Sequence, residues 1–206
     1  MYAPRPFAET DRERLHALVS AHGFATLVSL LDGEPFATHV PLLLDAARGP
    51  LGTLLGHMAR SNPHWRAFDG ATPALAIFHG PHAYVSPRWY RAPDQVPTWN
   101  YVVVHAAGAP RVVEDAAAVR ALLGRMAAQY EAGAEAPWSL AGLPERVADG
   151  LQRAIVAFEL PIERLEGKRK LSQNKAPADR AGVLAGLRAE GDAASLAVAA
   201  EMERVA

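Results

Sequence analysis

Hydrophobic and polar residues alternate over several short stretches of this chain, which predicts β-strands. Two β-rich runs at 24–31 and 35–44 flank Asp32-Gly33, a dipeptide typical of tight hairpin turns. The chain therefore begins its β-structure with an antiparallel hairpin. Further strands are predicted at 51–59, 73–78, 83–86, 98–107 and 155–165, with 109–113 continuing the preceding strand beyond a turn.

Helical spacing dominates elsewhere. Thr10 precedes Glu13 by three residues, a capping box that predicts a helix over 11–21. Pro63 after Ser61-Asn62 predicts a second helix start. Asp115 caps a helix whose apolar residues share one face. Helical segments are also expected at 137–150, 177–188 and 194–204, and 168–175 is expected to be a polar loop.

The order of these elements favours an antiparallel barrel, because the strands are joined by short turns rather than by helical crossovers. A chain of 206 residues suits one domain, or one domain with a small appendage. Neither GxGxxG nor GxxxxGK[ST] occurs, so a dinucleotide fingerprint and a P-loop are both excluded.

The charge balance argues against direct DNA binding. With 21 basic and 22 acidic side chains, the chain lacks the basic excess of dedicated binders, although Lys168-Arg169-Lys170 could form a local patch. The absence of cysteine excludes thiolate metal sites and thiol nucleophiles. No signal peptide and no apolar run of membrane-spanning length is visible. We therefore expect a soluble cytoplasmic protein.

The segment from Gly56 to Trp65 carries the most suggestive chemistry. Arg60 is a permanent cation whose planar fork suits phosphate, and Ser61 and Asn62 stand at a helix start, where free N–H groups attract anions. Ala59 is small enough to let backbone approach a flat ring. The alternative from residue type alone is a surface cation, a helix cap and a core tryptophan.

Other groups support weaker hypotheses. Eight histidines are present, but no carboxylate stands at a typical ligand spacing beside them, so a metal site is disfavoured. Aromatic residues alternate with hydrogen-bonding residues in 84–90 and 97–101, as in pockets for planar ligands or in a core seam. The basic and amide-rich segment 166–175 suits phosphate, or a solvated loop. No nucleophile–base pattern supports a hydrolase.

Taken together, these segments resemble the PaiB family, described as FMN-binding negative transcriptional regulators. The resemblance is spread in order over nearly the whole chain and weakens only after Leu187. Ser61 and His64 depart from the family pattern, where Ala and Gln are usual. The matching blocks are Met1-Tyr2 with Pro4 and Phe7, Leu27–Ser29, Thr38–Pro41, Gly56–Trp65, Ala76–Pro87, Trp89-Tyr90, Val96–Tyr101, Phe158-Glu159, Leu165–Lys168 and Lys170–Asn174.

The resemblance implies a mainly β fold with flanking helices (α+β), a six-stranded antiparallel split β-barrel that binds FMN at a homodimer interface. It implies a split-barrel domain over 1–175 and a C-terminal helical extension over 176–206. Arg60 becomes the leading phosphate ligand. The other cofactor-binding residues that it implies are His39, Gly56, His57, Ala59, Ser61, Asn62, Trp99, Asn100, Lys170, Ser172 and Gln173, some of them from the partner subunit.

Three functions remain open. The first is a flavoprotein with a redox or regulatory role, in which FMN carries the chemistry. The second is a transcriptional regulator that acts indirectly and without catalysis, because no helix-turn-helix is visible. The third is a haem-binding protein, since related split barrels handle haem; the phosphate-type residues favour FMN over it.

Overall fold

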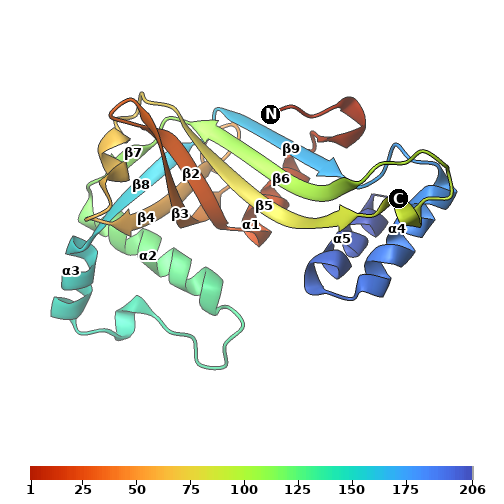
Figure 1. Cartoon of the computed structure of the whole chain (residues 1–206). Coiled ribbons are helices and arrows are strands. Elements are labelled where there is room, and N and C mark those ends of the chain that lie inside the picture. Colours follow the sequence, from red (N-terminus) through yellow and green to blue (C-terminus); the bar gives the residue numbers. More distant parts are fainter. Residues whose placement is uncertain (206) are drawn as a thin grey trace. The chain divides into compact units, whose positions relative to one another are not determined.

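The computed structural model describes residues 1–205, with helices and strands mostly where the sequence pattern predicts them (Figure 1). In chain order the elements are η1 (Arg5–Phe7), β1 (Ala8–Glu9), α1 (Arg12–Ala21), β2 (Phe24–Leu31), β3 (Glu34–Asp45), β4 (Thr53–Ala59), η2 (Pro63–Ala67), β5 (Ala74–Val85), η3 (Pro87–Trp89), β6 (Thr98–Gly108), β7 (Arg111–Val113), α2 (Ala116–Glu131), η4 (Leu140–Gly142), α3 (Glu145–Arg153), β8 (Ile155–Pro161), β9 (Arg164–Lys170), α4 (Pro177–Glu190) and α5 (Ala193–Arg204).

Within the described residues, nine strands form one sheet in the order β1-β9-β6-β5-β2-β3-β4-β8-β7. The ladders β2–β3, β3–β4 and β4–β8 are antiparallel, as expected. The expected mainly antiparallel sheet with flanking helices is confirmed, but the expected number of six strands is wrong, because nine strands form one sheet with β1 and β7 at its two ends. These end strands span two and three residues, too few to show a periodic pattern.

Two strand boundaries differ from prediction. The Gly80-Pro81 pair, a turn signal in sequence, lies inside the continuous strand β5. A Cβ atom on Gly80 would lie 3.0 Å from Cβ of Val102, so glycine permits the close approach of a neighbouring strand. The predicted strand 155–165 instead divides into β8 and β9, and β9 takes in the start of the predicted polar loop.

The chain divides into two compact units, which are described separately. Unit 1 comprises Met1–His22, Phe78–His105 and Glu166–Ala206, and unit 2 comprises Gly23–Ile77 and Ala106–Leu165. The boundary proposed from sequence, between 1–175 and 176–206, stays a prediction.

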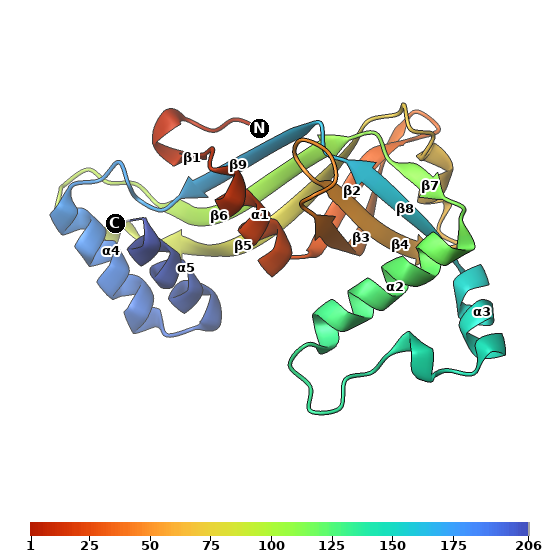
Figure 2. The same ribbon diagram turned by 180° about the vertical axis from the view of Figure 1, so that it is seen from behind.

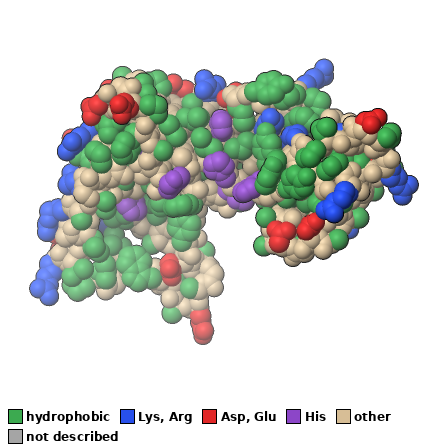
Figure 3. Space-filling model, viewed as in Figure 1, with side chains coloured by type: hydrophobic (Ala, Val, Ile, Leu, Met, Phe, Trp, Pro, Cys, Tyr) green, Lys and Arg blue, Asp and Glu red, His purple; other side chains and the backbone are tan. Residues whose placement is uncertain are grey.

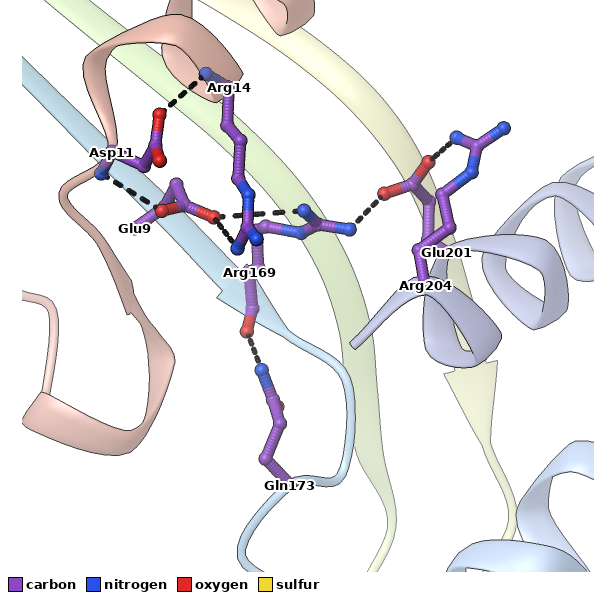
Figure 4. A network of polar contacts seen from close by, with 7 residues as sticks. All are labelled: Glu9, Asp11, Arg14, Arg169, Gln173, Glu201 and Arg204. Atoms are coloured by element: carbon purple, nitrogen blue, oxygen red, sulfur yellow. Dashed lines mark hydrogen bonds and ion pairs between the residues drawn. The ribbon is translucent and has the colours of Figure 1, made fainter. Parts of the chain in front are cut away.

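In unit 1, α4 and α5 pack on the sheet. Their apolar residues Val183, Leu187 and Val198 share a buried cluster with Val85 and Val102. The Ala-rich helix α5 is therefore part of a core, although its sequence pattern is only weakly amphipathic. A polar network beside this core joins β1, α1, β9 and α5 (Figure 4).

In unit 2, the hairpin of β2 and β3 turns through Asp32 and Gly33, whose φ angles are +54° and +84°. The alternation in β2 buries Ala25, Leu27 and Ser29 on one face. Helix α2 covers β4 and β8 (Figure 2). Its residues that pack against Leu43, Leu55 and Ala157 are Val119, Leu122 and Met126.

No helix among residues 1–205 combines the length and apolar character that crossing a membrane requires.

Candidate functional site

The predicted phosphate residues lie in the turn between β4 and η2, in unit 2. Arg60 and Ser61 are exposed at this turn. The backbone N–H of Arg60 donates to the carbonyl oxygen of Ala154 at 2.9 Å. Asn62 caps η2, because its Oδ1 accepts from the backbone N–H of His64 at 3.0 Å. The turn thus holds a cation and a hydroxyl at the surface on a fixed backbone.

The Arg60 side chain is partly anchored. Its Nε donates to the carbonyl of Arg153 at 2.8 Å, and its Nη2 donates to the carbonyl of Ile155 at 2.7 Å. Its Nη1 makes no hydrogen bond to another residue within 1–205. Because both bonded acceptors are neutral carbonyls, the guanidinium keeps its full charge for an anion. The residues at this turn therefore fit a phosphate group.

Below the turn lies a buried polar network that the sequence analysis did not identify. The His64 side chain has no exposed surface. Its Nε2 is hydrogen-bonded to Ser29 Oγ at 2.7 Å and its Nδ1 to Thr38 Oγ1 at 2.8 Å. Thr38 Oγ1 also accepts from Nδ2 of Asn62 at 3.1 Å. The turn is thereby tied to strands β2 and β3.

The predicted residues of β4 point to different faces of the strand. His57 is half-buried, and its Nδ1 is buried without a hydrogen-bond partner among the described residues. Burial lowers the pKa of His57 below 6.5, so its ring is neutral at pH 7. A Cβ on Gly56 would lie 2.7 Å from Cδ2 of Leu42 and 3.0 Å from Cζ of Phe158. Gly56 therefore makes room for core side chains, while Ala59 is exposed at the strand end.

His39 lies on the open face of β3, in register with Thr26 of β2. Its Nδ1 is hydrogen-bonded to Thr26 Oγ1 at 3.1 Å, and its ring stacks with Phe24 at a centroid distance of 6.4 Å. The same face exposes Phe24 and Leu30 by 69% and 54%. This open face combines an imidazole with unusually exposed apolar side chains.

A cavity of about 920 Å³ borders the turn within unit 2. Its size suits a small-molecule site. Arg60 is the predicted site residue among those that line it. Trp65, at the end of the segment singled out from sequence, also lines it. Residue types alone gave no signal for the rest of the lining, which includes Val119, Arg120, Gln152 and Ile155.

In unit 1, three predicted residues already have internal partners. Asn100 and Ser172 are 1% and 4% exposed, and Nδ2 of Asn100 donates to Ser172 Oγ at 3.0 Å. Oε1 of Gln173 accepts from the backbone N–H of Leu171 at 2.7 Å, and its Nε2 donates to the carbonyl of Arg169 at 2.6 Å. These side chains shape the bend after β9, where Ser172 has a φ of +63°.

Lys170 and Trp99 are more open. Nζ of Lys170 donates to the carbonyl of Trp99 at 2.9 Å and to Thr98 Oγ1. Burial, with the charges of Lys168 and Lys175, lowers the pKa of Lys170. Trp99 is 52% exposed. Its ring contacts those of Tyr84 and His82 at centroid distances of 6.1 and 6.4 Å.

The structure therefore collects the predicted residues into separate groups. The turn from Ala59 to Asn62 with His57 forms one group and His39 a second, both in unit 2. Trp99, Asn100, Lys170, Ser172 and Gln173 belong to unit 1. Across residues 1–205, no three His, Asp or Glu side chains converge in a way that could hold a metal ion.

Comparison with known proteins identifies the family. A family model described as "Putative FMN-binding domain" matches residues 1–164. The chain is 34% identical over 190 residues to "Protease synthase and sporulation protein PAI 2" of Bacillus subtilis, covering 92% of this chain and 90% of that protein.

Solved structures share the fold. The FAD and Heme binding protein of Mycobacterium smegmatis superposes with a TM-score of 0.60 at 22% identity, covering 79% of this chain and 73% of that one. The Flavocytochrome Anf3 of Azotobacter vinelandii superposes with a TM-score of 0.61 at 15% identity, covering 82% and 72%. The mainly antiparallel sheet with flanking helices is thus that of split-barrel flavoproteins, and the chain belongs to the PaiB-type family of FMN-binding domains.

Proposed function

We propose that this protein binds the phosphate of FMN at the turn between β4 and η2, with Arg60 as its principal ligand. The observation that carries this assignment is the Arg60 guanidinium, which is anchored by two neutral carbonyls and keeps Nη1 and its charge available. The Ser61 hydroxyl lies beside it on the same exposed turn. A cation and a hydroxyl on a rigid backbone form a preorganised phosphate site.

The bound flavin would supply electron-transfer chemistry, and the protein would supply binding and orientation. His57 offers a buried, neutral ring nitrogen without a partner among residues 1–205, which can accept or donate one hydrogen bond to a ligand. His39 offers a second imidazole on the open face of β3. In unit 1, Trp99 and Lys170 remain the stronger candidates, because Trp99 is 52% exposed and Lys170 uses two of its three N–H donors. The side chains of Asn100, Ser172 and Gln173 are engaged in internal hydrogen bonds.

We also propose that the protein is a homodimer that uses the open face of β2 and β3. Phe24 and Leu30 are each more than half exposed on this face. Hydrophobic side chains and histidines are visible on the side of the molecule drawn in Figure 3. Exposed apolar patches of this kind mark interfaces, and self-association usually follows two-fold symmetry.

A flavin-dependent role in regulation is compatible with this assignment. A net charge of -1 favours an indirect effect over direct recognition of DNA. The cytoplasmic location stays a prediction.

Substitution of Arg60 tests the phosphate site. Arg60→Ala removes a charge-assisted contact worth roughly 1.5–3 kcal/mol, so FMN affinity should fall about 10- to 150-fold. The measurement is a titration of the apoprotein with FMN in which binding is monitored by the quenching of flavin fluorescence. Arg66→Ala is the matched control, because Arg66 is an exposed cation on the neighbouring η2.

Arg60→Lys distinguishes the contribution of the charge from that of the guanidinium geometry. The variant keeps the positive charge but loses the planar group that donates to two carbonyls, so its affinity for FMN should lie between those of Arg60→Ala and the wild type. Thermal melting of each variant checks that the turn remains folded. Unchanged affinity in folded Arg60→Ala would remove Arg60 from the site, and a Soret band in place of a flavin spectrum would favour haem.

Phe24→Asp tests the proposed dimer. A charge in the centre of an apolar interface is desolvated without a partner, so the variant should sediment as a monomer of about 22 kDa while the wild type sediments as a dimer. Tyr2→Asp is the control, because Tyr2 is 84% exposed in unit 1, outside the proposed face. A monomeric wild type, or a dimeric Phe24→Asp, contradicts the proposed interface.

A further inference from the structure

His64 is the most completely enclosed titratable side chain beside the proposed phosphate site. It has no exposed surface, and its ring packs between Phe36 and Phe68 at centroid distances of 5.0 and 5.2 Å. Both ring nitrogens are occupied by hydroxyl groups, those of Ser29 and Thr38. A histidine held in this way is a structural connector rather than a surface base.

Burial of the ring favours its neutral form. In either neutral tautomer one nitrogen donates and the other accepts, and a hydroxyl can take either role. Protonation would make both nitrogens donors and would place a positive charge between two phenyl rings. No carboxylate of residues 1–205 is hydrogen-bonded to the ring to offset this charge, and an uncompensated buried charge is costly.

The charged groups on the neighbouring elements do not change this conclusion. Arg66 of η2 lies over the ring of Trp65, at 6.0 Å from its centroid. Asp69, beyond η2, has its carboxylate occupied by Ala71 and Thr72. Asp32 lies at the β2–β3 turn. Burial therefore lowers the pKa of His64 below 6.5.

The same network holds the turn that carries Arg60. Thr38 Oγ1 contacts both Nδ1 of His64 and Nδ2 of Asn62, at 2.8 and 3.1 Å. Asn62 Oδ1 in turn accepts from the backbone N–H of His64. Thr38, Asn62 and His64 thus close a ring of hydrogen bonds. Thr38 therefore connects the imidazole to Asn62, two residues after Arg60.

We propose that neutral His64 is a positioning residue for the turn between β4 and η2 that carries Arg60, called here the phosphate turn. We further propose that protonation of His64 loosens this turn and weakens FMN binding in acid. This inference rests on the proposed function, because it requires that FMN phosphate binds at Arg60. The site would bind FMN tightly at neutral pH and release it as the pH falls through the pKa of His64.

The test compares FMN affinity of the wild type and His64→Gln between pH 8 and pH 5. Glutamine offers an amide NH2 as donor and a carbonyl oxygen as acceptor but is not protonated in this pH range. The second ionisation of a phosphate monoester, near pH 6, affects both proteins equally and cancels in their ratio. The wild type should lose at least about tenfold more affinity than His64→Gln over this range. The control His79→Gln removes an exposed histidine of β5 and should keep the wild-type profile.

A second measurement uses the wild type alone. Linkage is reciprocal, so a tenfold weakening by protonation requires that saturating FMN lowers the pKa of His64 by about one unit. The pKa is followed by NMR of ring-labelled histidine, with and without FMN. This readout remains decisive if His64→Gln does not fold, which circular dichroism at pH 8 would reveal.

The outcomes separate the two proposals. If FMN binds at pH 8 but the pH profiles of the wild type and His64→Gln coincide, the positioning role is overturned and the phosphate site stands. An identical pKa of His64 with and without FMN overturns it as well. If neither protein binds FMN at pH 8, the proposed function fails and the inference that rests on it falls too.

Discussion

The two units of the chain each contain a buried polar network, and the two networks differ in charge. In unit 2, His64, Ser29, Thr38 and Asn62 form a network of neutral groups beneath the proposed phosphate turn. In unit 1, Arg169 lies between the carboxylates of Glu9 and Glu201 (Figure 4).

The network of unit 1 joins distant parts of the sequence. Nη2 of Arg169 donates to Oε2 of Glu201 at 2.7 Å, and its Nη1 lies 3.6 Å from Oε2 of Glu9. The three side chains are 7–10% exposed. Strand β9 is thereby linked to the short strand β1 and to helix α5.

The two networks differ in whether they contain a neutral ring that can gain a proton. In unit 1 the network is a set of ion pairs around the guanidinium of Arg169. In unit 2 the network is built on a neutral ring, because burial lowers the pKa of His64. We expect a proton on this ring to disturb the turn that carries Arg60.

The largest effect is expected from Arg169→Leu. It removes the buried cation between Glu9 and Glu201 and leaves these carboxylates only the exposed cations Arg14 and Arg204, and breaking such a buried pair typically costs about 3–5 kcal/mol. Urea unfolding at pH 8 measures the loss. Arg14→Leu is the control, because Arg14 is 64% exposed and lies 3.7 Å from Glu9, where a pair is worth at most about 1 kcal/mol. Similar losses in both variants would show that unit 1 does not depend on the buried pair.

Much of the fold follows from local pattern. The run from Phe24 to Leu31 is the strand predicted, the Asp32-Gly33 turn is confirmed, and the helix after Asp115 begins at that cap. The first helix is also confirmed, but its cap is Asp11, which accepts from the backbone N–H of Arg14, and not Thr10. In each case the signal is carried by neighbours in sequence. The strand number is wrong because pairing at the sheet ends depends on partners distant in the chain, such as Ala8 with Lys168.

The candidate site was only partly predictable for the same reason. The turn at Arg60 is contiguous in sequence, so its charge and capping residues could be recognised. The network below it draws Ser29, Thr38 and His64 from three elements, and no spacing rule brings them together. For Lys168 and Arg169 the sequence pattern predicted the wrong environment. A run of basic residues favours a solvated loop, whereas both residues are buried in β9 with 8% exposure.

A smaller effect is expected from Thr38→Val in unit 2. Valine has nearly the same shape, but it leaves Nδ1 of His64 and Nδ2 of Asn62 without their shared partner, which costs about 1–3 kcal/mol. Urea unfolding measures this loss, with Thr26→Val as control, because Thr26 bonds the exposed His39 rather than the network. Thr38→Val should also weaken FMN binding at pH 8, because Asn62 no longer holds the turn. Lost stability with unchanged FMN affinity would mean that the network supports the sheet and does not position the phosphate.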